Sequence, residues 1–432
     1  MFRYNNELKD SKVEYIGKIP KSWEIIRNKH IFNKTKVIAG PNWDKYNVLS
    51  LTKNGVIIKD IERNEGKMPS DFSIYQIVNP GNLLMCLFDI DVTPRCVGYI
   101  ENKGIVSAAY TELSPIVDIN MKYYYWWYLM LDIDKQLLHL SKNLRNSLST
   151  EDFMALSVVK PPLEEQIQIA NYLDKKTAKI DSTIAKNKKL IDLLEEKRVS
   201  LINQIVTKGL NPDVPMKDSG IEWIGNIPEH WDIINLKKCC ETITDGSHFS
   251  PETTSDGKYY ITVRNVLEDR IDFENAPKIS IEDYKVLKNN GCEPKKGDVL
   301  LSKDGTIGKC IVVDKKDFVI LSSLGLLRPN NLTMPEYLRY YLLSDINIKQ
   351  MNSHIRGSAI KRLTINIIKE LLMILPPLDE QEKFVQYLNP KIEKINNTIK
   401  KIQYNIELLE EYKTSVIQHV VTGKIDVREE MI

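Results

Sequence analysis

Two segments that begin Pro161-Pro-Leu-Glu-Glu-Gln166 and Pro376-Pro-Leu-Asp-Glu-Gln381 decide how this chain is built. They match each other without a gap for about 47 residues, with Tyr172-Leu173 aligned on Tyr387-Leu388. A repeat of this length indicates a duplicated structural unit. Diproline ends whatever element precedes it, and proline is tolerated at the start of a helix. The sequence therefore predicts two matching helices, each beginning just after a diproline.

A shorter pair of matching segments lies ahead of each helix. Residues 13–23 and 221–231 share the pattern Gly-x-Ile-Pro-x-x-Trp. Its members are Gly17, Pro20 and Trp23 in the first copy, and Gly225, Pro228 and Trp231 in the second. We expect the two tryptophans to anchor the first strand of each globular segment in its core; a partner-binding surface is the alternative.

Both pairs occur in the same order, so the 432-residue chain reads as two successive units of about 210 residues. The predicted boundaries place globular segments at 1–160 and 211–375. The helical segments are 161–210 and 376–432, the latter including a C-terminal tail.

The two helical segments carry a narrow apolar stripe with 3-4 spacing, which is typical of a coiled coil. Thr177, Asn187 and Arg198 interrupt the first stripe, and Lys413 interrupts the second. An amphipathic helix packed on its own domain is the simpler reading of one such stripe. Because the stripe is long and duplicated, we expect the two helices to pair within the chain. Periodicity leaves their relative direction open, although an antiparallel pair joins the globular segments most simply. The predicted seam residues are Leu173, Ile180, Ile184, Ile191, Leu194, Leu201, Ile205, Leu388, Ile392, Ile395, Ile399, Ile402, Ile406, Leu409, Val416 and Val420.

The globular segments read as mixed α/β. Strands are expected at 46–52, 82–88 and 299–302, and aromatic-rich helices at 122–140 and 334–343. The run of six aromatic residues at 123–128 could stack on nucleic-acid bases. At helical spacing these side chains face several directions, so we expect most of them in the core. The fold class is therefore α/β (α+β), with two pseudo-repeated globular domains and two long helices.

Composition excludes several classes of protein. Lys and Arg number 60 and Asp and Glu 58, a net charge of +2, which argues against binding nucleic acid through bulk positive charge alone. No apolar stretch approaches the ~18 residues of a membrane span, and no signal peptide is recognisable. The six cysteines form no CxxC and no zinc pattern, so reduced thiols in the cytoplasm are expected.

Catalytic motifs are missing as well. The segment 305–309 resembles a phosphate-binding loop only loosely, because its spacing is wrong and no Ser or Thr follows the lysine. Neither diproline has the polar and aromatic neighbours that an adenine methyltransferase needs to hold a flipped base. The six histidines show no metal spacing. We therefore predict a chain that is not an enzyme by itself and has no metal site.

Taken together, these motifs resemble the specificity subunit of a type I restriction–modification system. The resemblance rests on the two Gly-x-Ile-Pro-x-x-Trp and two Pro-Pro-Leu-x-Glu-Gln motifs. It also rests on the linker 209–225, on Asp245-Gly-Ser-His248 and on the segment 297–308. It covers the whole chain, and the linker and helix openings are its most specific parts.

The resemblance implies a non-catalytic DNA-recognition subunit that acts in the prokaryotic cytoplasm, associated with the nucleoid, in defence against phage. Each globular segment would be a target recognition domain that reads one half of a bipartite, asymmetric sequence in double-stranded DNA. The helices would pair antiparallel, set the spacer and dock two modification subunits. Those partners would methylate adenine with S-adenosylmethionine, and restriction subunits that use ATP and Mg would join them; this chain would hold no cofactor.

Two physical estimates agree with that role. The seam from Leu173 to Ile205 spans roughly 50 Å at 1.5 Å per residue, which separates half-sites by about one to one and a half turns of DNA. The segment 1–160 has 21 basic and 18 acidic residues, and 211–375 has 22 and 23. Neither domain is strongly basic, so we expect local basic loops and a share of phosphate binding by partners.

Candidate DNA contacts are polar or basic residues on loops beside glycines, where the backbone can approach DNA. Gly246 and Gly305 would shape such loops, and Asp245 and Asp304 would brace them. In the first domain the candidates are Thr52, Lys53, Asn54, Arg63, Arg95, Arg145, Asn146 and Ser147. In the second they are Ser247, His248, Arg264, Asn265, Lys303, Thr306, Lys309, Arg356, Ser358, Lys361 and Arg362.

Two other functions remain open at this stage. One is a coiled-coil scaffold that binds proteins and does not read DNA, and the other is an inactive remnant. The interiors of the globular segments differ far more than the helices do, and a symmetric scaffold would have no need of that difference.

Overall fold

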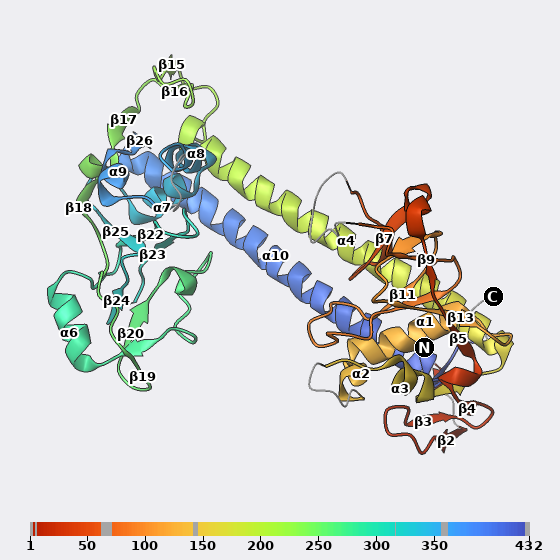
Figure 1. Cartoon of the computed structure of the whole chain (residues 1–432). Helices are drawn as coiled ribbons and strands as arrows, with labels where there is room; N and C mark the ends of the chain where they lie inside the picture. The colour runs from red at the N-terminus through yellow and green to blue at the C-terminus, as the bar shows by residue number, and fades with distance from the viewer. Residues whose placement is uncertain are drawn as a thin grey trace. The chain divides into compact units, whose positions relative to one another are not determined.

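A computed structural model describes residues 3–4, 7–61, 71–140, 146–315, 317–355 and 362–427 of the chain (Figure 1). The chain divides into two compact units, one of residues 1–187 and 403–432 and the other of residues 188–402. We refer to them as unit 1 and unit 2. In the part of the chain that is described, no helix is long and apolar enough to cross a membrane.

The two predicted helices are present as α4 (Leu163–Lys208) and α10 (Leu378–Val421), and each contributes one half to each unit. Both begin directly after a diproline, as the sequence predicts, and both carry acidic residues in the first turn, where the helix dipole favours them. In unit 1 the first half of α4 lies beside the last half of α10, whereas in unit 2 the last half of α4 lies beside the first half of α10. Ion and hydrogen-bond pairs mark both contacts: Lys413 with Asp181 in unit 1 and Arg198 with Asn396 in unit 2. The two helices are therefore antiparallel.

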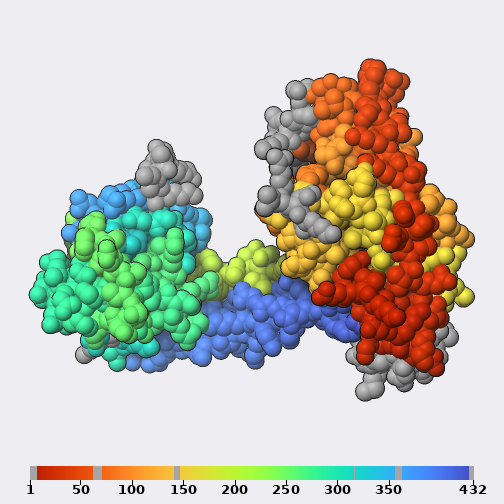
Figure 2. Space-filling model, turned by 60° about the horizontal axis from the view of Figure 1, so that its bottom comes forward, coloured from red at the N-terminus to blue at the C-terminus, as the bar shows by residue number. Residues whose placement is uncertain are grey.

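The predicted seam residues face the partner helix or a globular core. Leu173, Leu388 and Val420 are fully buried, and most other members are nearly so. Ile191, Leu194, Leu201 and Leu409 are half-buried. In Figure 2, part of α10, drawn in blue, reaches the surface on the face in view.

Each unit contains a four-stranded antiparallel sheet of the same order. In unit 1 the order is β11 (Val97–Tyr99), β10 (Leu83–Met85), β13 (Thr111–Pro115) and β5 (Phe32–Thr35). In unit 2 it is β23 (Cys310–Val312), β22 (Val299–Ser302), β25 (Leu324–Pro329) and β18 (Cys240–Asp245). The duplication in sequence is thus also a duplication in topology.

Each unit adds a second sheet with one parallel strand pair. In unit 1, β12 (Gly104–Val106) runs parallel to β7 (Asn47–Thr52), which forms a hairpin with β8 (Gly55–Ile58). In unit 2, β20 (Lys258–Ile261) runs parallel to β24 (Phe318–Ile320), and α6 (Ile281–Asn289) packs beside β24. On the other side of β12 lie β9 (Gln76–Val78) and then the edge strand β6 (Val37–Ile38), and on the other side of β20 lie β21 (Lys278–Ile279) and then the edge strand β19 (Thr253–Thr254).

An aromatic-rich helix joins each antiparallel sheet to the long helices. In unit 1 this helix is α1 (Met121–Ile133), and in unit 2 it is α7 (Pro335–Leu343), followed by α8 (Asp345–Ser353) and α9 (Ile365–Glu370). Tyr123, Tyr124 and Trp127 are fully buried in the core of unit 1, as expected for a packing role. The single helix predicted over 122–140 is wrong in one respect. Lys135 adopts a left-handed conformation (φ 53°) that ends α1 and precedes the short α2 (Gln136–His139).

Short strand pairs close both units. In unit 1, β4 (Glu24–Arg27) pairs with β14 (Ser157–Lys160), just ahead of α4. In unit 2, β17 (Asp232–Asn235) pairs with β26 (Leu372–Leu375), just ahead of α10. In unit 1, β1 (Arg3–Tyr4) also pairs with β27 (Ile425–Asp426). Each globular domain is therefore tied to the start of a long helix by a two-stranded ribbon.

Candidate nucleic-acid interface and its supporting frame

The two duplicated sequence motifs bind each other. In unit 1 the indole Nε1 of Trp23 donates to Glu165 Oε2 at 2.9 Å, and in unit 2 Trp231 Nε1 donates to Glu380 Oε2 at 3.1 Å. Both indoles are buried, so each carboxylate satisfies a donor that would otherwise be stranded. The predicted anchoring of the tryptophans in the domain core is confirmed, and the acceptor is the glutamate of the Pro-Pro-Leu-x-Glu-Gln motif.

The glutamine of the same motif holds the aromatic-rich helix. Gln166 Oε1 accepts from the backbone N–H of Asn120 at 2.8 Å, and its Nε2 donates to Pro161 O at 2.8 Å. In unit 2, Gln381 Oε1 accepts from the N–H of Met334 at 2.9 Å. Both glutamines are buried and use donor and acceptor at once. They fix the start of α1 and α7 to the start of the adjoining long helix.

A third duplicated contact lies about two turns further along each long helix. Trp126 Nε1 donates to Asp174 Oδ1 at 2.9 Å in unit 1, and Tyr340 OH donates to Asn389 Oδ1 at 2.7 Å in unit 2. Asp174 and Asn389 stand at the same distance from their diprolines. The attachment of each domain to its helix is therefore the same at three positions, although the residue types differ at the third.

The predicted loop braces are present in unit 2. Lys303 Nζ lies 3.3 Å from Asp245 Oδ2 and 3.6 Å from Asp304 Oδ2, and Arg362 Nε lies 3.2 Å from Asp304 Oδ1. The lysine side chain is only 1% exposed. Burying an ammonium group is costly unless it is paired with carboxylates, and Asp245 and Asp304 provide that pairing. Asp245 and Asp304 thus hold the three loops that follow β18, follow β22 and precede α9.

Three of the candidate DNA contacts are committed to the protein itself. Lys303 is one, because its ammonium is buried between two carboxylates. Ser247 is buried, and its Oγ donates to Phe249 O at 2.6 Å. Asn265 is buried and caps a short turn through Thr262. In the structure these three side chains shape loops, and their contact with DNA stays a prediction.

Other candidates of unit 2 are exposed. His248, Arg264, Thr306 and Arg362 lie on the surface of loops. Lys309 is half-buried, and its Nζ donates to the backbone O of Val266 at 3.0 Å. Among these residues Arg362 lies beside the braced loops, because its guanidinium contacts Asp304.

In unit 1 the candidates occupy two places. Lys53 and Asn54 are exposed at the tip of the β7–β8 hairpin, whose turn is held by Thr52 Oγ1 donating to Gly55 O at 3.1 Å. Arg95 is half-buried, and its Nη1 donates to Tyr125 OH at 3.2 Å.

Asn146 and Ser147 form the second place, on the loop that leads to α3 (Thr150–Ala155). Asn146 is left-handed (φ 50°), and its backbone O accepts from Ile90 N–H at 3.0 Å. Both residues are half-buried. Arg63, Arg145, Arg356, Ser358 and Lys361 lie outside the described residues.

The described residues offer neither a metal-binding group nor a reactive thiol. No group of three or more His, Cys, Asp or Glu side chains there could hold a metal ion. All six cysteines are free and buried. Burial raises the pKa of the Cys240 and Cys310 thiols to about 12, so both are protonated and poor nucleophiles at neutral pH.

Sequence reasoning identifies the anchoring motifs but misses how they work. It assigns no role to Glu165, Gln166, Glu380 or Gln381, although both copies preserve the Glu-Gln pair. The duplication itself is the available signal, because a buried indole needs an acceptor and each copy offers a carboxylate in the same place.

Comparison with known proteins gives a consistent result. The family model described as type I restriction modification DNA specificity domain matches residues 87–193 and 228–408. The type I restriction enzyme MjaVIII specificity subunit of Methanocaldococcus jannaschii is 24% identical over 430 residues, which covers 95% of each chain. The type I restriction enzyme EcoBI specificity subunit of Escherichia coli is 25% identical over 263 residues, covering 56% of this chain and 54% of that one.

Solved structures share the fold. A chain from the work "Structural basis underlying complex assembly and conformational transition of the type I R-M system" has a TM-score of 0.67 at 14% identity, covering 93% of this chain and 98% of that one. The HsdS subunit from Thermoanaerobacter tengcongensis has a TM-score of 0.50 at 15% identity, covering 96% and 99%. The two matched regions span both halves of the chain and include most of each long helix, so this chain belongs to the type I restriction–modification DNA specificity family, whose members recognise DNA and are not enzymes by themselves.

Proposed function

We propose that each globular domain reads one half of a bipartite, asymmetric DNA target. One observation carries the proposal: the frames that attach the two domains to α4 and α10 are the same, while the loops that they support differ. In unit 1 the exposed polar tip is the β7–β8 hairpin with Lys53 and Asn54. In unit 2 it is the set of loops braced by Asp245, Lys303 and Asp304. Two domains that are attached to the long helices in the same way but present different contact surfaces are suited to reading two different half-sites at a fixed separation.

We propose DNA contacts at the candidate residues whose side chains are exposed or half-buried. In unit 2 they are made by His248, Arg264, Thr306, Lys309 and Arg362, with Ser247, Asn265 and Lys303 shaping the loops. In unit 1 they are made by Thr52, Lys53, Asn54, Arg95, Asn146 and Ser147. Arg63, Arg145, Arg356, Ser358 and Lys361 complete the proposed set from the sequence.

We further propose that the helix pair sets the spacer and docks two copies of an adenine-N6 methyltransferase subunit. Leu193 on α4 and Leu408 on α10 stand at matching positions of the repeat, and both are large exposed apolar residues at 50% and 42%. A leucine exposed at the same place in both copies supports two equivalent docking points. The methyltransferase subunits would supply S-adenosylmethionine, and restriction subunits with ATP and Mg would join through them. The complex would act on DNA in the prokaryotic cytoplasm.

The deciding experiment is genome-wide mapping of N6-methyladenine in a host that expresses the methyltransferase subunit with and without this chain. A bipartite motif that requires the chain is the expected result. Methylation that is absent, or unchanged without the chain, would contradict the proposal and favour a scaffold or an inactive remnant.

A further inference from the structure

At one position of the repeat, a positively charged side chain has a different partner in each unit. Counted from the diproline, Arg198 of α4 corresponds to Lys413 of α10, and Asp181 corresponds to Asn396. In unit 1, Lys413 Nζ lies 2.6 and 2.7 Å from the two carboxylate oxygens of Asp181 on the facing helix. In unit 2 the facing residue is the neutral Asn396, whose Oδ1 accepts from Arg198 Nη1 at 2.8 Å. The helix pair of unit 2 therefore lacks the carboxylate that unit 1 has at this position.

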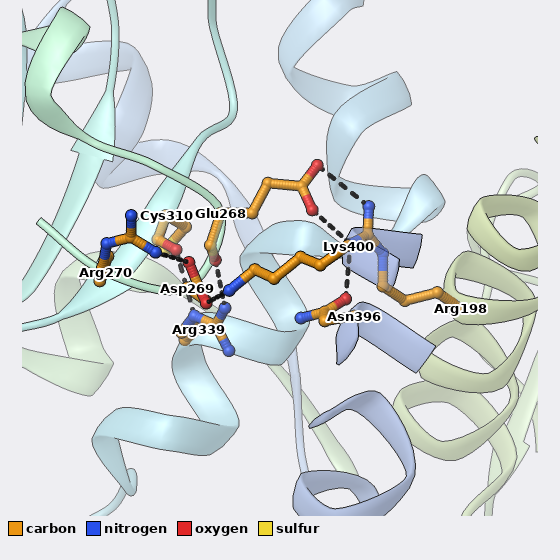
Figure 3. A network of polar contacts seen from close by, with 8 residues as sticks. All are labelled: Arg198, Glu268, Asp269, Arg270, Cys310, Arg339, Asn396 and Lys400. Carbon is orange, nitrogen blue, oxygen red and sulfur yellow. Dashed lines mark hydrogen bonds and ion pairs between the residues drawn. The ribbon is translucent and has the colours of Figure 1, made fainter. Parts of the chain in front are cut away.

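A hairpin of the globular domain provides the missing charge (Figure 3). Glu268 Oε2 lies 2.5 Å from Arg198 Nη1, and Glu268 Oε1 accepts from Nη2 at 3.2 Å, a two-point contact. The arginine side chain is 17% exposed, so its charge is partly desolvated and benefits from a carboxylate partner. A second ion pair adds to it: Lys400 Nζ on α10 lies 2.5 Å from Asp269 Oδ2.

The hairpin is a defined element of unit 2. Val266 and Ile271 form an antiparallel bridge, and Leu267 N–H donates to Arg270 O at 3.0 Å, which places Glu268 and Asp269 at the tip. The tip also receives a hydrogen bond from α7, where Arg339 Nη2 donates to Glu268 O at 2.8 Å. Three helices thus hold the two acidic residues of one turn.

The base of this hairpin reaches the candidate DNA contacts. Arg264 and Asn265 precede it directly, and Lys309 donates to Val266 O at 3.0 Å. The tip is fixed to the long helices, and the base carries two of the cations proposed to meet DNA. The hairpin is therefore a mechanical link between the helix pair and the reading loops.

Apolar packing holds the base of the hairpin, where Val266 and Ile271 are buried in a hydrophobic cluster, but it is incomplete between Leu267 and the long helices. A pocket of about 260 Å³ beside the hairpin is lined by Leu267 of the hairpin, Ile202 of α4 and Ile392 of α10. The pocket between these side chains reduces the dispersion contacts that hold the turn to the helices. Isolated surface ion pairs contribute little, but a two-point arginine contact within a network of charges is the exception. The attachment of this turn rests on the polar network.

We infer that Glu268 is a positioning residue for target reading: its contact with Arg198 fixes the reading loops of the second domain relative to the helix pair and so fixes the spacer of the target. The inference rests on the proposed function. It predicts that removing the carboxylate leaves the half-sites readable but loosens the separation at which both are read.

Two variants and their combination separate this role from plain stability. Glu268→Gln removes the charge at the tip and keeps the shape of the side chain. Asn396→Asp gives Arg198 a carboxylate on the facing helix, as in unit 1, and so competes with Glu268 without removing it. The double variant restores an ion pair within the helices but not the link to the hairpin.

The experiment uses the full complex with its methyltransferase subunit. The probes are synthetic duplexes that carry the mapped wild-type motif with its native spacer, or with one base pair fewer or more. We expect all three variants to methylate the native duplex, with discrimination against altered spacers reduced by about two- to fivefold, the range of one such ion pair. Asn396→Asp should do so at unchanged or higher thermal stability. Wild-type discrimination in Glu268→Gln and in Asn396→Asp would overturn the inference.

A second measurement on the chain alone keeps this outcome distinct from failure of the proposed function. Amide hydrogen exchange at residues 266–271 should become faster in Glu268→Gln and in Asn396→Asp. Elsewhere in unit 2, exchange should stay as slow as in the wild-type protein. If the wild-type complex shows no bipartite motif, the proposed function fails. Unchanged exchange at the hairpin in both variants would overturn the link between Glu268 and Arg198 whatever the methylation result.

Discussion

Gly423 lies directly against the ring of Trp23 in unit 1: a Cβ on this glycine would come within 2.7 Å of two ring carbons and 2.5 Å of Pro20 Cγ. Gly209 has the same relation to Trp231 in unit 2, but there the nearest ring carbon would be 3.2 Å away. Both glycines have positive φ, 68° and 74°. The chain therefore leaves each long helix through a glycine that faces the anchoring tryptophan.

Gly423→Ala should destabilise the protein more than Gly209→Ala. Both changes place an L-residue in the left-handed region, at about 1–2 kcal/mol, and only Gly423→Ala adds a severe overlap with a rigid ring. Gly17→Ala is the matched control, since Gly17 also has positive φ (69°) but a Cβ added there would meet no atom within 4 Å. Denaturant unfolding of the three variants should rank Gly423 worst, and equal losses at all three would contradict the packing argument.

Replacing either anchoring tryptophan should weaken its unit by a similar amount. Trp23→Phe and Trp231→Phe each remove a buried N–H donor from its contact with a part-buried glutamate and leave space in the core, for a loss of roughly 2–4 kcal/mol. Glu165→Gln should cost less, because an amide oxygen still accepts the hydrogen bond. Trp223→Phe serves as the control, because Trp223 is 42% exposed. The free energies of unfolding of these variants measure the effect. An unchanged free energy of unfolding in Trp231→Phe would refute the prediction.

Lys303→Ala and Arg264→Ala should separate bracing from contact with DNA. Loss of the Lys303 ammonium leaves Asp245 and Asp304 close together without their buried counter-charge, which should destabilise unit 2 by about 3 kcal/mol or more. Arg264 is exposed, so its removal should leave stability within about 0.5 kcal/mol while weakening DNA binding. Thermal unfolding and a DNA-binding titration at fixed salt distinguish the two. A stable Lys303→Ala protein with reduced binding would reverse the assignment.

The cysteines should be unreactive in the native protein. All six are free and buried, and burial raises the pKa of each thiol, to about 12 for Cys240 and Cys310. Since only the thiolate reacts readily, a disulfide reagent at neutral pH should label no cysteine quickly in the folded chain and all six in denaturant. Fast labelling of a cysteine in the native state would show that its part of the core opens.

The sequence is most informative where the repeat and periodicity act together. A 3-4 apolar stripe that occurs twice predicts two long helices, and the diprolines predict their first turns at Leu163 and Leu378. Burial of the aromatic run follows from its spacing, since six consecutive helical side chains cannot all face one surface. These features depend on local pattern, which a sequence displays directly.

Features that depend on contacts across the chain could not be read in the same way. The break at Lys135 requires a left-handed residue that the apolar pattern conceals. Lys303 is expected on a surface loop, because lysine is rarely buried, yet two aspartates from different loops enclose it. The role of Glu268 depends on a residue 70 positions away on a helix, and the only hint of it in the sequence is that Asn396 replaces the aspartate of the first copy.

The pairing of β1 with β27 brings residues 3–4 and 425–426 side by side in unit 1. In unit 2 the path from the end of α4 to the anchoring tryptophan is covalent. It runs through the linker 209–225 and continues to Trp231. In unit 1 the equivalent passage, from Gly423 to Trp23, is made by a strand pair between residues that are far apart along the chain. The same junction thus forms with and without a continuous backbone. We therefore expect that a continuous linker is not required in unit 2. A chain that is cut within residues 210–220, and whose original ends are joined instead, should still form both domains.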